Sequence, residues 1–209
     1  MADNENTWDK RLHIKTSGRD DTNSDGYCYP YEPTPYGVLE RLVGCGYFAE
    51  GDVILDYGCG KGRVGFFLSH RAKANTIGIE YNERIYKAAL KNQESATSKA
   101  RVEFVLSRAE EYEVPHNATG CYFFNPFSVE ILQKVLAKIL ESYYAAPREV
   151  LLFFYYPSDE YISCLMAVEE LEFLDEIRCE GMIEGIRERE RVVIFRLPGL
   201  EDPGTSKRT

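Results

Sequence analysis

Apolar positions along this chain follow two different periods. From residue 52 onward, short apolar runs alternate with longer segments in which apolar side chains recur every three or four residues. A short run predicts a buried strand, and the longer spacing predicts a helix that packs by one face. On this basis we expect strands at residues 53–57, 76–80, 101–107, 120–125, 149–156, 171–179 and 191–197. We expect helices at residues 62–72, 83–97 and 128–144, and a further helix from residue 159.

The order of these elements defines the expected fold class. Strand and helix alternate through most of the chain, which is typical of an α/β fold with a mostly parallel sheet and helices on both faces. The longest helix, residues 128–144, carries an apolar stripe that includes Ile131, Leu132 and Val135. Residues 181–190 join the last two of the seven strands without such a stripe, so a hairpin-like connection is expected there.

Composition divides the chain into three segments. Residues 1–26 are polar and rich in Asp, Asn, Ser and Gly, which predicts a mobile arm or a lid. Residues 27–198 hold the expected strands and helices and form the predicted domain, and a length of 209 residues fits one domain. Residues 199–209 are polar and predict a flexible tail.

A segment rich in Tyr and Pro links the arm to the domain. Thr34-Pro35 has the pattern of a helix cap followed by a proline in the first turn, and an apolar helical stripe comes after it. Tyr31 and Tyr36 belong to a crowd of tyrosines before the domain, and Tyr155 ends the fifth strand. Two interpretations stay open. These rings line an aromatic cleft for a methylammonium group or a base, or they pack the arm onto the sheet.

Charge and hydropathy limit the partners. The chain carries a net charge of −9. An acidic surface repels phosphate backbones, so nucleic acid is disfavoured as a partner and a cationic acceptor such as a lysine side chain is favoured. No apolar run approaches the roughly 20 residues of a membrane helix, and the N-terminus contains no apolar signal segment. We therefore expect a cytoplasmic protein without a membrane partner.

Cysteine and histidine spacing argues against a metal site. None of the six cysteines stands in a C-x-x-C pair, and the three histidines are equally scattered. Structural zinc sites are built from such clusters, so no metal is predicted. The cysteines are expected to be buried and reduced, because free cysteine is among the most buried residue types.

A glycine-rich turn carries most of the chemical information. A predicted strand runs into the glycines of VILDYGCGKGRVG and then into a helix. Glycines at such a place permit a tight turn and the close approach of a ligand to the backbone. In one register, residues 60–65 match the G-x-G-x-x-G dinucleotide fingerprint, with Glu80 20 residues after Gly60. In a second register, residues 56–62 match the D-x-G-x-G-x-G turn of methyltransferases.

Three features favour the second register. Asp56 stands at the end of the strand, where its carboxylate suits a cation and repels a pyrophosphate. The apolar run stops at Leu55, which places the turn at Tyr57–Gly58 instead of Gly60. About fifty residues precede the motif, whereas dinucleotide domains often begin almost at it. A glycine turn without a ligand is a third interpretation, although alternating glycines weaken a fold unless the space is used.

These motifs resemble those of class I S-adenosylmethionine-dependent methyltransferases, and the resemblance covers residues 27–198. More narrowly, YEPTPYGVLERL, VILDYGCGKGRVG, IGIEYN and FFNPFSVEIL together resemble an uncharacterised bacterial family of such enzymes, with PYEPTPY, DYGCGKG and NPF motifs. The resemblance implies a Rossmann-like fold, S-adenosylmethionine as the cofactor and methyltransferase activity. It does not name the acceptor.

The same resemblance assigns the contacts to the methionine and ribose parts of the cofactor. Asp56, Gly58, Gly60 and Gly62 would hold the methionine part. Glu80, at the end of the second strand, would accept hydrogen bonds from both ribose hydroxyls, because two vicinal donors suit one carboxylate. The alternative is that Glu80 is a solvated acid at a strand end.

The expected contacts to the adenine are less regular in this chain. Tyr81 is expected to lie along the adenine ring. The family usually has an acid after the third strand to bind the adenine amino group, and this chain has Arg108 there. Either Glu110 takes over this bond, or the backbone at Ala109 recognises the adenine alone.

A candidate catalytic element follows the fourth strand. Asn125-Pro126-Phe127 is similar to the D/N-P-P-Y/F/W element of amine and amide N-methyltransferases, with one proline in place of two. In that element the Asn oxygen and a carbonyl at the proline accept hydrogens from a target NH₂, and the aromatic ring covers the target. We therefore predict these three residues as catalytic and Asn125 also as a cofactor contact. In the alternative, Asn and Pro only cap the next helix.

The leading functional prediction is an N-methyltransferase that acts on a protein side chain or on a small-molecule amine. A small-molecule O- or C-methyltransferase is the first alternative, and Asn125-Pro126-Phe127 would then be structural. Oxygen acceptors often need a base or a metal, and no histidine lies in a recognisable constellation. A nicotinamide-binding oxidoreductase is the second alternative, and a cofactor-binding module without catalysis is the third.

Overall fold

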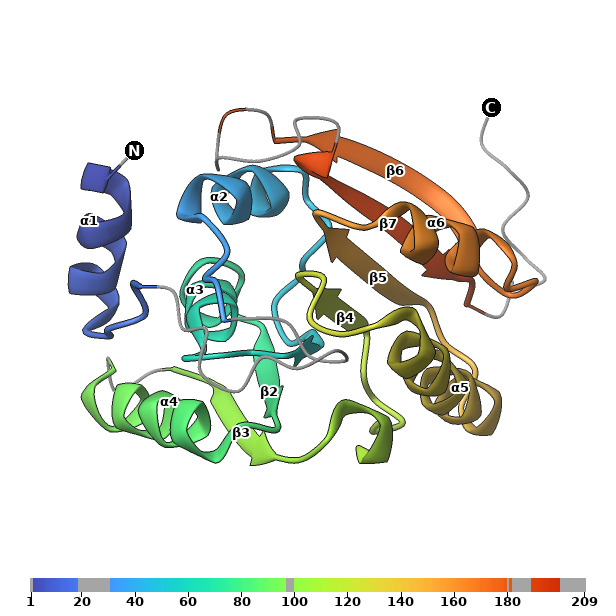
Figure 1. Cartoon of the computed structure of the whole chain (residues 1–209), viewed down its shortest axis with the longest axis horizontal. Coiled ribbons are helices and arrows are strands. Elements are labelled where there is room, and N and C mark those ends of the chain that lie inside the picture. Colours follow the sequence, from blue (N-terminus) through green and yellow to red (C-terminus); the bar gives the residue numbers. More distant parts are fainter. Residues whose placement is uncertain (1, 19–30, 97–99, 180, 182–188, 200–209) are drawn as a thin grey trace.

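The computed structural model describes the chain except for residues 1, 19–30, 97–99, 180, 182–188 and 200–209. A seven-stranded sheet forms the centre, and helices lie on both of its faces (Figure 1). The strands are β1 Val53–Tyr57, β2 Asn75–Glu80, β3 Val102–Leu106, β4 Gly120–Phe123, β5 Val150–Tyr155, β6 Glu172–Arg178 and β7 Arg191–Leu197. The helices are α1 Ala2–Leu12, α2 Tyr36–Gly44, α3 Arg63–Ala72, α4 Glu83–Ser95, α5 Val129–Ala145 and α6 Asp159–Met166, with a short 3₁₀ helix, η1, at Ala109–Glu111.

The strand order in the sheet is β3-β2-β1-β4-β5-β7-β6. The strands from β3 to β5 are parallel, whereas β7 lies antiparallel between β5 and β6. The winding direction reverses at β1, because β2 and β3 lie on one side of it and β4 and β5 on the other. In open α/β sheets, ligands bind outside the carboxyl ends of the strands at such a switch point.

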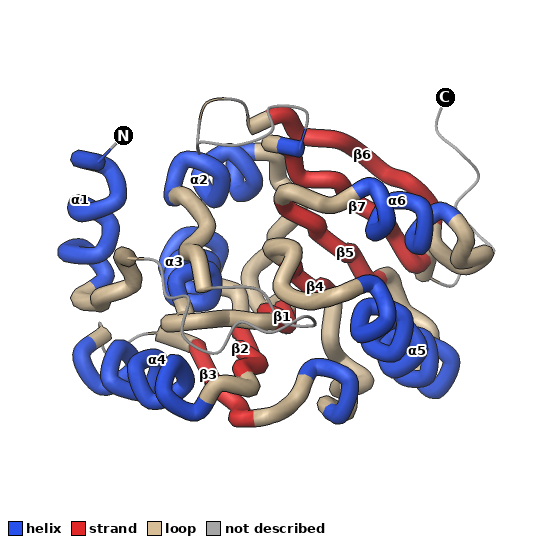
Figure 2. The backbone as a smooth tube through the Cα atoms, viewed as in Figure 1, coloured by secondary structure: helices blue, strands red, loops and turns tan. Residues whose placement is uncertain are grey.

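Helices lie over both faces of the sheet (Figure 2), and one hydrophobic cluster is buried on each face. On one face, Leu39 of α2, Phe67 of α3 and Ala89 of α4 are buried in the first cluster. On the other face, Leu132 of α5 and Leu165 of α6 are buried in the second cluster. A sheet that is buried on both faces needs apolar side chains in both directions, which explains the nearly continuous apolar runs of β1 and β5.

The expected α/β fold and all seven strands are confirmed. Predicted and observed strand ends differ by no more than two residues. The antiparallel pair of β6 and β7 agrees with the hairpin-like connection expected between them, of which residues 182–188 lie outside the described part. The tail predicted for residues 199–209 also lies outside it, apart from Gly199.

Helix α1 is a feature that the sequence did not predict. It lies within residues 1–26, for which composition predicts a mobile arm or a lid. Its Trp8 and Leu12 are buried, and the Trp8 ring contacts Phe67 of α3 edge-on at 4.8 Å between centroids. Few apolar side chains anchor this helix, so its hydrophobic period is too weak to stand out in a polar sequence.

The predicted cap at Thr34 is wrong. Pro35 takes the N-cap position of α2, and the first N–H of the helix, that of Tyr36, donates to the carboxylate of Glu5 on α1 at 2.9 Å. The Thr34 hydroxyl instead lies 3.1 Å from the hydroxyl of Tyr122 on β4, and its carbonyl accepts a hydrogen bond from Arg63. A buried partner on the sheet therefore competes successfully for the side chain that would otherwise cap the helix.

The described cysteines are free thiols, but not all of them are buried. Cys45 is exposed and Cys164 is half-buried, so the prediction of burial is wrong for Cys45. This residue follows the last residue of α2 and is not covered by another element. Cys28 lies outside the described residues. The buried thiols are those of Cys59, Cys121 and Cys179.

Candidate active site

The carboxyl ends of the parallel strands bring several predicted site residues together. Glu80 ends β2, Asp56 is the last but one residue of β1, and the Asn125 turn follows β4. Strand β1 pairs on both sides, so Asp56 lies beside Gly78 of β2 and Tyr122 of β4. The candidate site is therefore the edge of the sheet at its topological switch point.

Asp56 is a buried carboxyl group, and one of its two oxygens has no partner among the described residues. It is 3% exposed, and its Oδ2 atom has no hydrogen-bond partner among the described residues. Burial raises the pKa of this carboxyl to about 8, and the negative charge of Glu80 adds to the rise. A buried carboxylate is costly unless it is paired. The geometry therefore favours a cationic group beside Asp56.

Backbone donors fix the direction of the Glu80 carboxylate. The N–H of Gly60 donates to Oε2 at 3.0 Å, and the N–H of Asn82 donates to Oε1 at 2.9 Å. Burial raises the pKa of this carboxyl, and the backbone donors oppose the rise. Glu80 is 5% exposed, so the alternative of a solvated strand-end acid is wrong. Each oxygen keeps a further acceptor site, because a carboxylate has about four lone-pair directions.

The glycine turn packs directly against the turn after β4. Gly58 has a φ of +72°, which favours glycine, and a Cβ there would lie 2.6 Å from the Cβ of Pro126. Gly58 is therefore required both by its conformation and by this contact. The space at Gly62 is taken by the ring of Phe104, so that glycine allows α3 to pack closely on the sheet. The contact between Gly58 and Pro126 joins the two sequence motifs into one site.

Asn125 combines a strained backbone with an unsatisfied side chain. Its φ is 40°, in the left-handed region that residues other than glycine rarely adopt. Its Oδ1 atom is buried and has no hydrogen-bond partner among the described residues. Helix α5 begins at Val129 with Ser128 at the N-cap position, so Asn125 does not cap it. Strain and an unmatched acceptor in one residue are typical of functional sites.

The side chain of Phe127 is buried in the core. It is 4% exposed and belongs to the hydrophobic cluster beneath α5 and α6. Its ring meets that of Phe123 edge-on at 6.3 Å between centroids, and its carbonyl accepts a hydrogen bond of 2.6 Å from the hydroxyl of Tyr161. The sequence interpretation placed this ring over the methyl acceptor, and the structure places it in the core instead.

Apolar side chains are exposed next to Glu80. Tyr81 follows β2 and is 37% exposed, and Leu106 ends β3 and is 46% exposed. Beyond them, Glu110 in η1 lies 3.8 Å from the guanidinium of Arg108, and Ala109 packs against the cluster beneath α5. Leu106 is not recognisable as a site residue from the sequence, because an exposed apolar residue at a strand end has the same pattern as a core residue.

Tyr155 is a further buried polar residue near the site. From the sequence it is only one of several tyrosines without an individual role. It lies at the end of β5, in the same cluster as Tyr122, and its ring packs against Phe124 at 4.6 Å between centroids. Its hydroxyl has no hydrogen-bond partner among the described residues, and burial raises its pKa well above the usual range. The Tyr155 hydroxyl is therefore a neutral, buried donor without a partner among the described residues.

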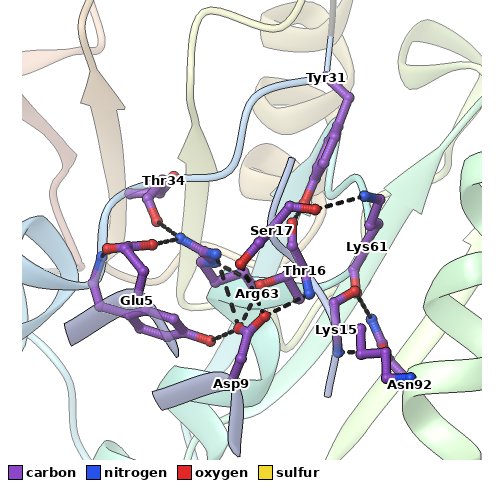
Figure 3. Close-up of polar contacts among 11 residues, drawn as sticks. Glu5, Asp9, Lys15, Thr16, Ser17, Tyr31, Thr34, Lys61, Arg63 and Asn92 are labelled. Carbon is purple, nitrogen blue, oxygen red and sulfur yellow. Dashed lines mark hydrogen bonds and ion pairs between the residues drawn. The ribbon is translucent and has the colours of Figure 1, made fainter. Parts of the chain in front are cut away.

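Residues before the domain cover the glycine turn (Figure 3). The ring of Tyr31 fills the space next to Gly60 where a Cβ would stand, and its hydroxyl donates to the carbonyl of Thr16 at 2.6 Å. The ring of Tyr36 lies 4.4 Å from the guanidinium carbon of Arg63, the first residue of α3. Tyr31 and Tyr36 thus connect the N-terminal segment to the glycine turn and α3, whereas one of the two sequence interpretations had them pack the arm onto the sheet.

Neither a metal-ligand cluster nor a membrane-spanning helix occurs in the part of the chain that the structure describes. Its His, Cys, Asp and Glu side chains form no group of three or more that could hold a metal ion. None of the helices in the described ranges has the length and apolar character needed to cross a membrane. The functional groups at the candidate site are the carboxyl, amide, hydroxyl and backbone groups described above.

Comparison with known proteins adds an independent observation. Residues 54–146 match the model of a methyltransferase domain. A protein-lysine N-methyltransferase of Saccharolobus islandicus (strain REY15A) is 26% identical over 113 residues, which are 54% of this chain and 70% of that protein. The RNA methyltransferase of Salinibacter ruber, solved with S-adenosyl-L-homocysteine, has a TM-score of 0.57 and 22% identity, over 84% of this chain and 99% of that one. A putative tRNA (m1A22) methyltransferase of Streptococcus pneumoniae has a TM-score of 0.59 and 15% identity, over 78% and 71% of the two chains.

The fold and the matched domain together define the class of protein. It is an enzyme, a methyltransferase of the Rossmann-like fold, and its cofactor is S-adenosylmethionine. Of the two registers of the glycine turn, the methyltransferase register at residues 56–62 is the one that fits this class. The narrower resemblance to an uncharacterised bacterial family stays a prediction.

Proposed function

We propose that this methyltransferase transfers its methyl group to a nitrogen atom, on a protein side chain such as lysine or on a small-molecule amine. One observation carries the proposal. The amide oxygen of Asn125 is buried and has no partner among the residues that the structure describes, and it lies on a strained turn whose Pro126 packs on the glycine turn. A fixed acceptor atom suits an N–H donor on the methyl acceptor. The similarity to a protein-lysine N-methyltransferase supports the same acceptor class.

The unmatched polar atoms of the site fit the polar groups of the cofactor. The carboxylate of Asp56 suits the ammonium of the methionine part, because a cation relieves the cost of burying an unpaired charge. Glu80 is aimed by backbone donors and keeps acceptor sites for the two ribose hydroxyls. The turn from Gly58 to Gly62 supplies the backbone that lies along the methionine part.

The adenine is assigned to the strand ends next to Glu80. Tyr81 and Leu106 offer exposed apolar surface for the faces of the ring. Because Glu110 is held close to Arg108, the backbone at Ala109 is the stronger candidate for recognition of the adenine amino group.

The main catalytic task of the protein in our proposal is to position the acceptor nitrogen against the methyl group. When bound, the cofactor supplies a methyl group already activated by its sulfonium, so little acid–base help is needed and orientation dominates. In our proposal the Oδ1 atom of Asn125 accepts a hydrogen from the acceptor N–H and thereby orients the nitrogen lone pair. The buried aromatic surroundings of Tyr122 and Tyr155 favour the uncharged form of an amine, and only that form has a free lone pair.

A nitrogen of an RNA base is the second candidate acceptor. A cavity of about 810 Å³ between α1 and α4 is lined by Lys10, His13, Lys15 and Lys91, among others. Such a local excess of positive charge suits phosphate groups, although the chain as a whole has a net charge of −9. The solved structures of RNA methyltransferases that share this fold favour the same alternative.

One labelling experiment separates these acceptors. The purified protein is incubated with S-adenosylmethionine carrying a radiolabelled methyl group and with a cell extract, which is then treated with ribonuclease or with protease. We expect label that survives ribonuclease and appears as methylated amino acid after acid hydrolysis, or label in a small amine. Label that ribonuclease releases would move the proposal to RNA. Label that mild base releases, as from a methyl ester, would overturn nitrogen transfer.

A further inference from the structure

The space beside Gly60 is filled by this chain itself. Gly60 has a φ of +57°, and a Cβ there would collide with the ring of Tyr31. Glycine in a nucleotide-binding turn ordinarily leaves room for a ligand. At this position the room is used by the ring of Tyr31, from the segment that precedes α2.

Two contacts hold the side chain of Tyr31 in place, and a third fixes the lysine that lies against its ring. Its hydroxyl donates to the carbonyl of Thr16 at 2.6 Å. The ammonium of Lys61 lies 4.8 Å from the ring centroid, within the range of a cation–π contact. The same ammonium donates to the carbonyl of Ser17 at 3.1 Å. Burial raises the pKa of Tyr31 well above the usual range, so the hydroxyl stays a neutral donor.

The segment that carries Thr16 is itself fixed to helix α3 (Figure 3). The carboxylate of Asp9 accepts hydrogen bonds from the backbone N–H of Thr16 at 2.8 Å and from its hydroxyl at 2.7 Å. The Nε of Arg63 donates to the Thr16 hydroxyl at 2.7 Å, and Arg63 also pairs with Glu5 of α1. Arg63 directly follows Gly62, so α1 is tied to the residue at which the glycine turn ends.

A second tie comes from helix α4. The side chain of Asn92 accepts a hydrogen bond from the N–H of Lys15 at 2.8 Å and donates to the carbonyl of Lys61 at 2.9 Å. Asn92 is buried. One amide group therefore bridges the N-terminal segment and the glycine turn.

We propose that Tyr31 is a positioning residue of the cofactor site, and that the described N-terminal residues 2–18 and 31–36 are a built part of that site. The ring keeps Gly60 next to Glu80, whose carboxylate accepts a hydrogen bond from the Gly60 N–H. Without the ring, the turn gains freedom, and Glu80 loses the donor that aims its carboxylate. The inference rests on the cofactor contacts assigned under the proposed function, and it does not depend on the acceptor.

Binding of S-adenosylhomocysteine to the full chain tests the inference without any acceptor. Isothermal calorimetry compares the unchanged protein with Tyr31→Ala, Tyr31→Phe and the control Tyr144→Ala, whose tyrosine lies exposed on α5. We expect Tyr31→Ala to weaken binding about tenfold or more, and Tyr31→Phe, which loses only the bond to Thr16, by about threefold. Tyr144→Ala should bind as the unchanged protein does.

A second measurement separates positioning from folding. Trp8 is the single tryptophan of the chain, so its fluorescence reports whether α1 stays docked. We expect Tyr31→Ala to keep the Trp8 emission of the unchanged protein while its affinity falls. Should it fail to fold, Tyr31→Leu keeps apolar volume over Gly60 and takes its place in the comparison.

Two results would overturn the inference. Equal affinity of Tyr31→Ala and the unchanged protein would reduce Tyr31 to a packing residue. Tighter binding by Tyr31→Ala would show that the ring obstructs the cofactor. If the affinities behave as expected and the methyl label is found only on oxygen, the proposed function fails while the inference on Tyr31 stands.

Discussion

Gly58 and Pro126 are in such close contact that a Cβ at Gly58 would lie 2.6 Å from the Cβ of Pro126. The contact joins the turn after β1 to the turn after β4. Asp56 precedes one side of this contact and Asn125 precedes the other, and each has a buried oxygen without a partner among the described residues. In the proposed mechanism the group that binds the cofactor and the group that orients the acceptor are therefore held by one rigid junction.

Replacement of Gly58 tests this junction. Gly58→Ala should abolish most binding of S-adenosylhomocysteine, because the new methyl group forces the two turns apart. Gly51→Ala is a matched control, since Gly51 also has a positive φ but nothing lies within 4 Å of its missing Cβ. The control should cost about 1 kcal/mol of stability from backbone strain and leave binding intact. Calorimetric titration and thermal melting of both variants measure this, and equal affinities would contradict a junction role.

Ligand-induced stabilisation tests the cofactor. A ligand that binds only the folded state at about 100 times its Kd adds about 2.7 kcal/mol, and for a chain of this length each kcal/mol shifts Tm by about 2–4 °C. We therefore expect S-adenosylhomocysteine to raise Tm by about 5–10 °C, and NAD to leave it unchanged. Differential scanning fluorimetry with both ligands gives the answer. A shift with NAD alone would restore the dinucleotide interpretation of residues 60–65.

The raised pKa of Asp56 predicts that the free protein becomes less stable as pH rises. Its pKa is raised from 3.8 to about 8 in the folded protein, so between these values the folded state holds a proton that the unfolded state has released. Stability of the free protein then falls as pH rises through this window. Asp56→Asn should remove the loss and raise Tm at pH 7.5 more than at pH 5. Calorimetric scans of both proteins at both pH values check this, and a Tm of Asp56→Asn below that of the unchanged protein at pH 7.5 would argue against a protonated Asp56.

Binding of the cofactor should reverse that protonation. An ammonium beside Asp56 favours the carboxylate, so we expect S-adenosylhomocysteine to bind more tightly as pH rises from 6 toward 8 and to release a proton near pH 7. Titration calorimetry in two buffers with different ionisation enthalpies counts the proton. Asp56→Asn is the control and should release none. An unchanged proton count in the two proteins would place the ammonium elsewhere.

The sequence predicts well those elements whose pattern lies within a few consecutive residues. Strands such as β5 and the glycine turn are recognisable from period and residue type alone, and the site acids Asp56 and Glu80 follow from their place at strand ends. Helix α1 was missed because pairing of Glu5 with Arg63 joins segments far apart in the chain. The ring of Phe127 was misplaced because a turn after a strand can aim one side chain to either face of the sheet.

The last prediction separates acceptor positioning from structure at Asn125. If Oδ1 accepts a hydrogen from the acceptor, Asn125→Ala should reduce methyl transfer about a hundredfold, or about 2.7 kcal/mol of lost positioning, with almost unchanged affinity for S-adenosylhomocysteine. Stability should change little, because the variant removes an unmatched buried oxygen but also replaces Asn, which tolerates a positive φ, with Ala, which does so less well. Asn117→Ala, at an exposed position before β4, is the matched control and should transfer at the unchanged rate. Single-turnover labelling, cofactor titration and melting of the two variants are sufficient. Full transfer by Asn125→Ala would mean that another group orients the acceptor, and the unpartnered hydroxyl of Tyr155 would be the next candidate.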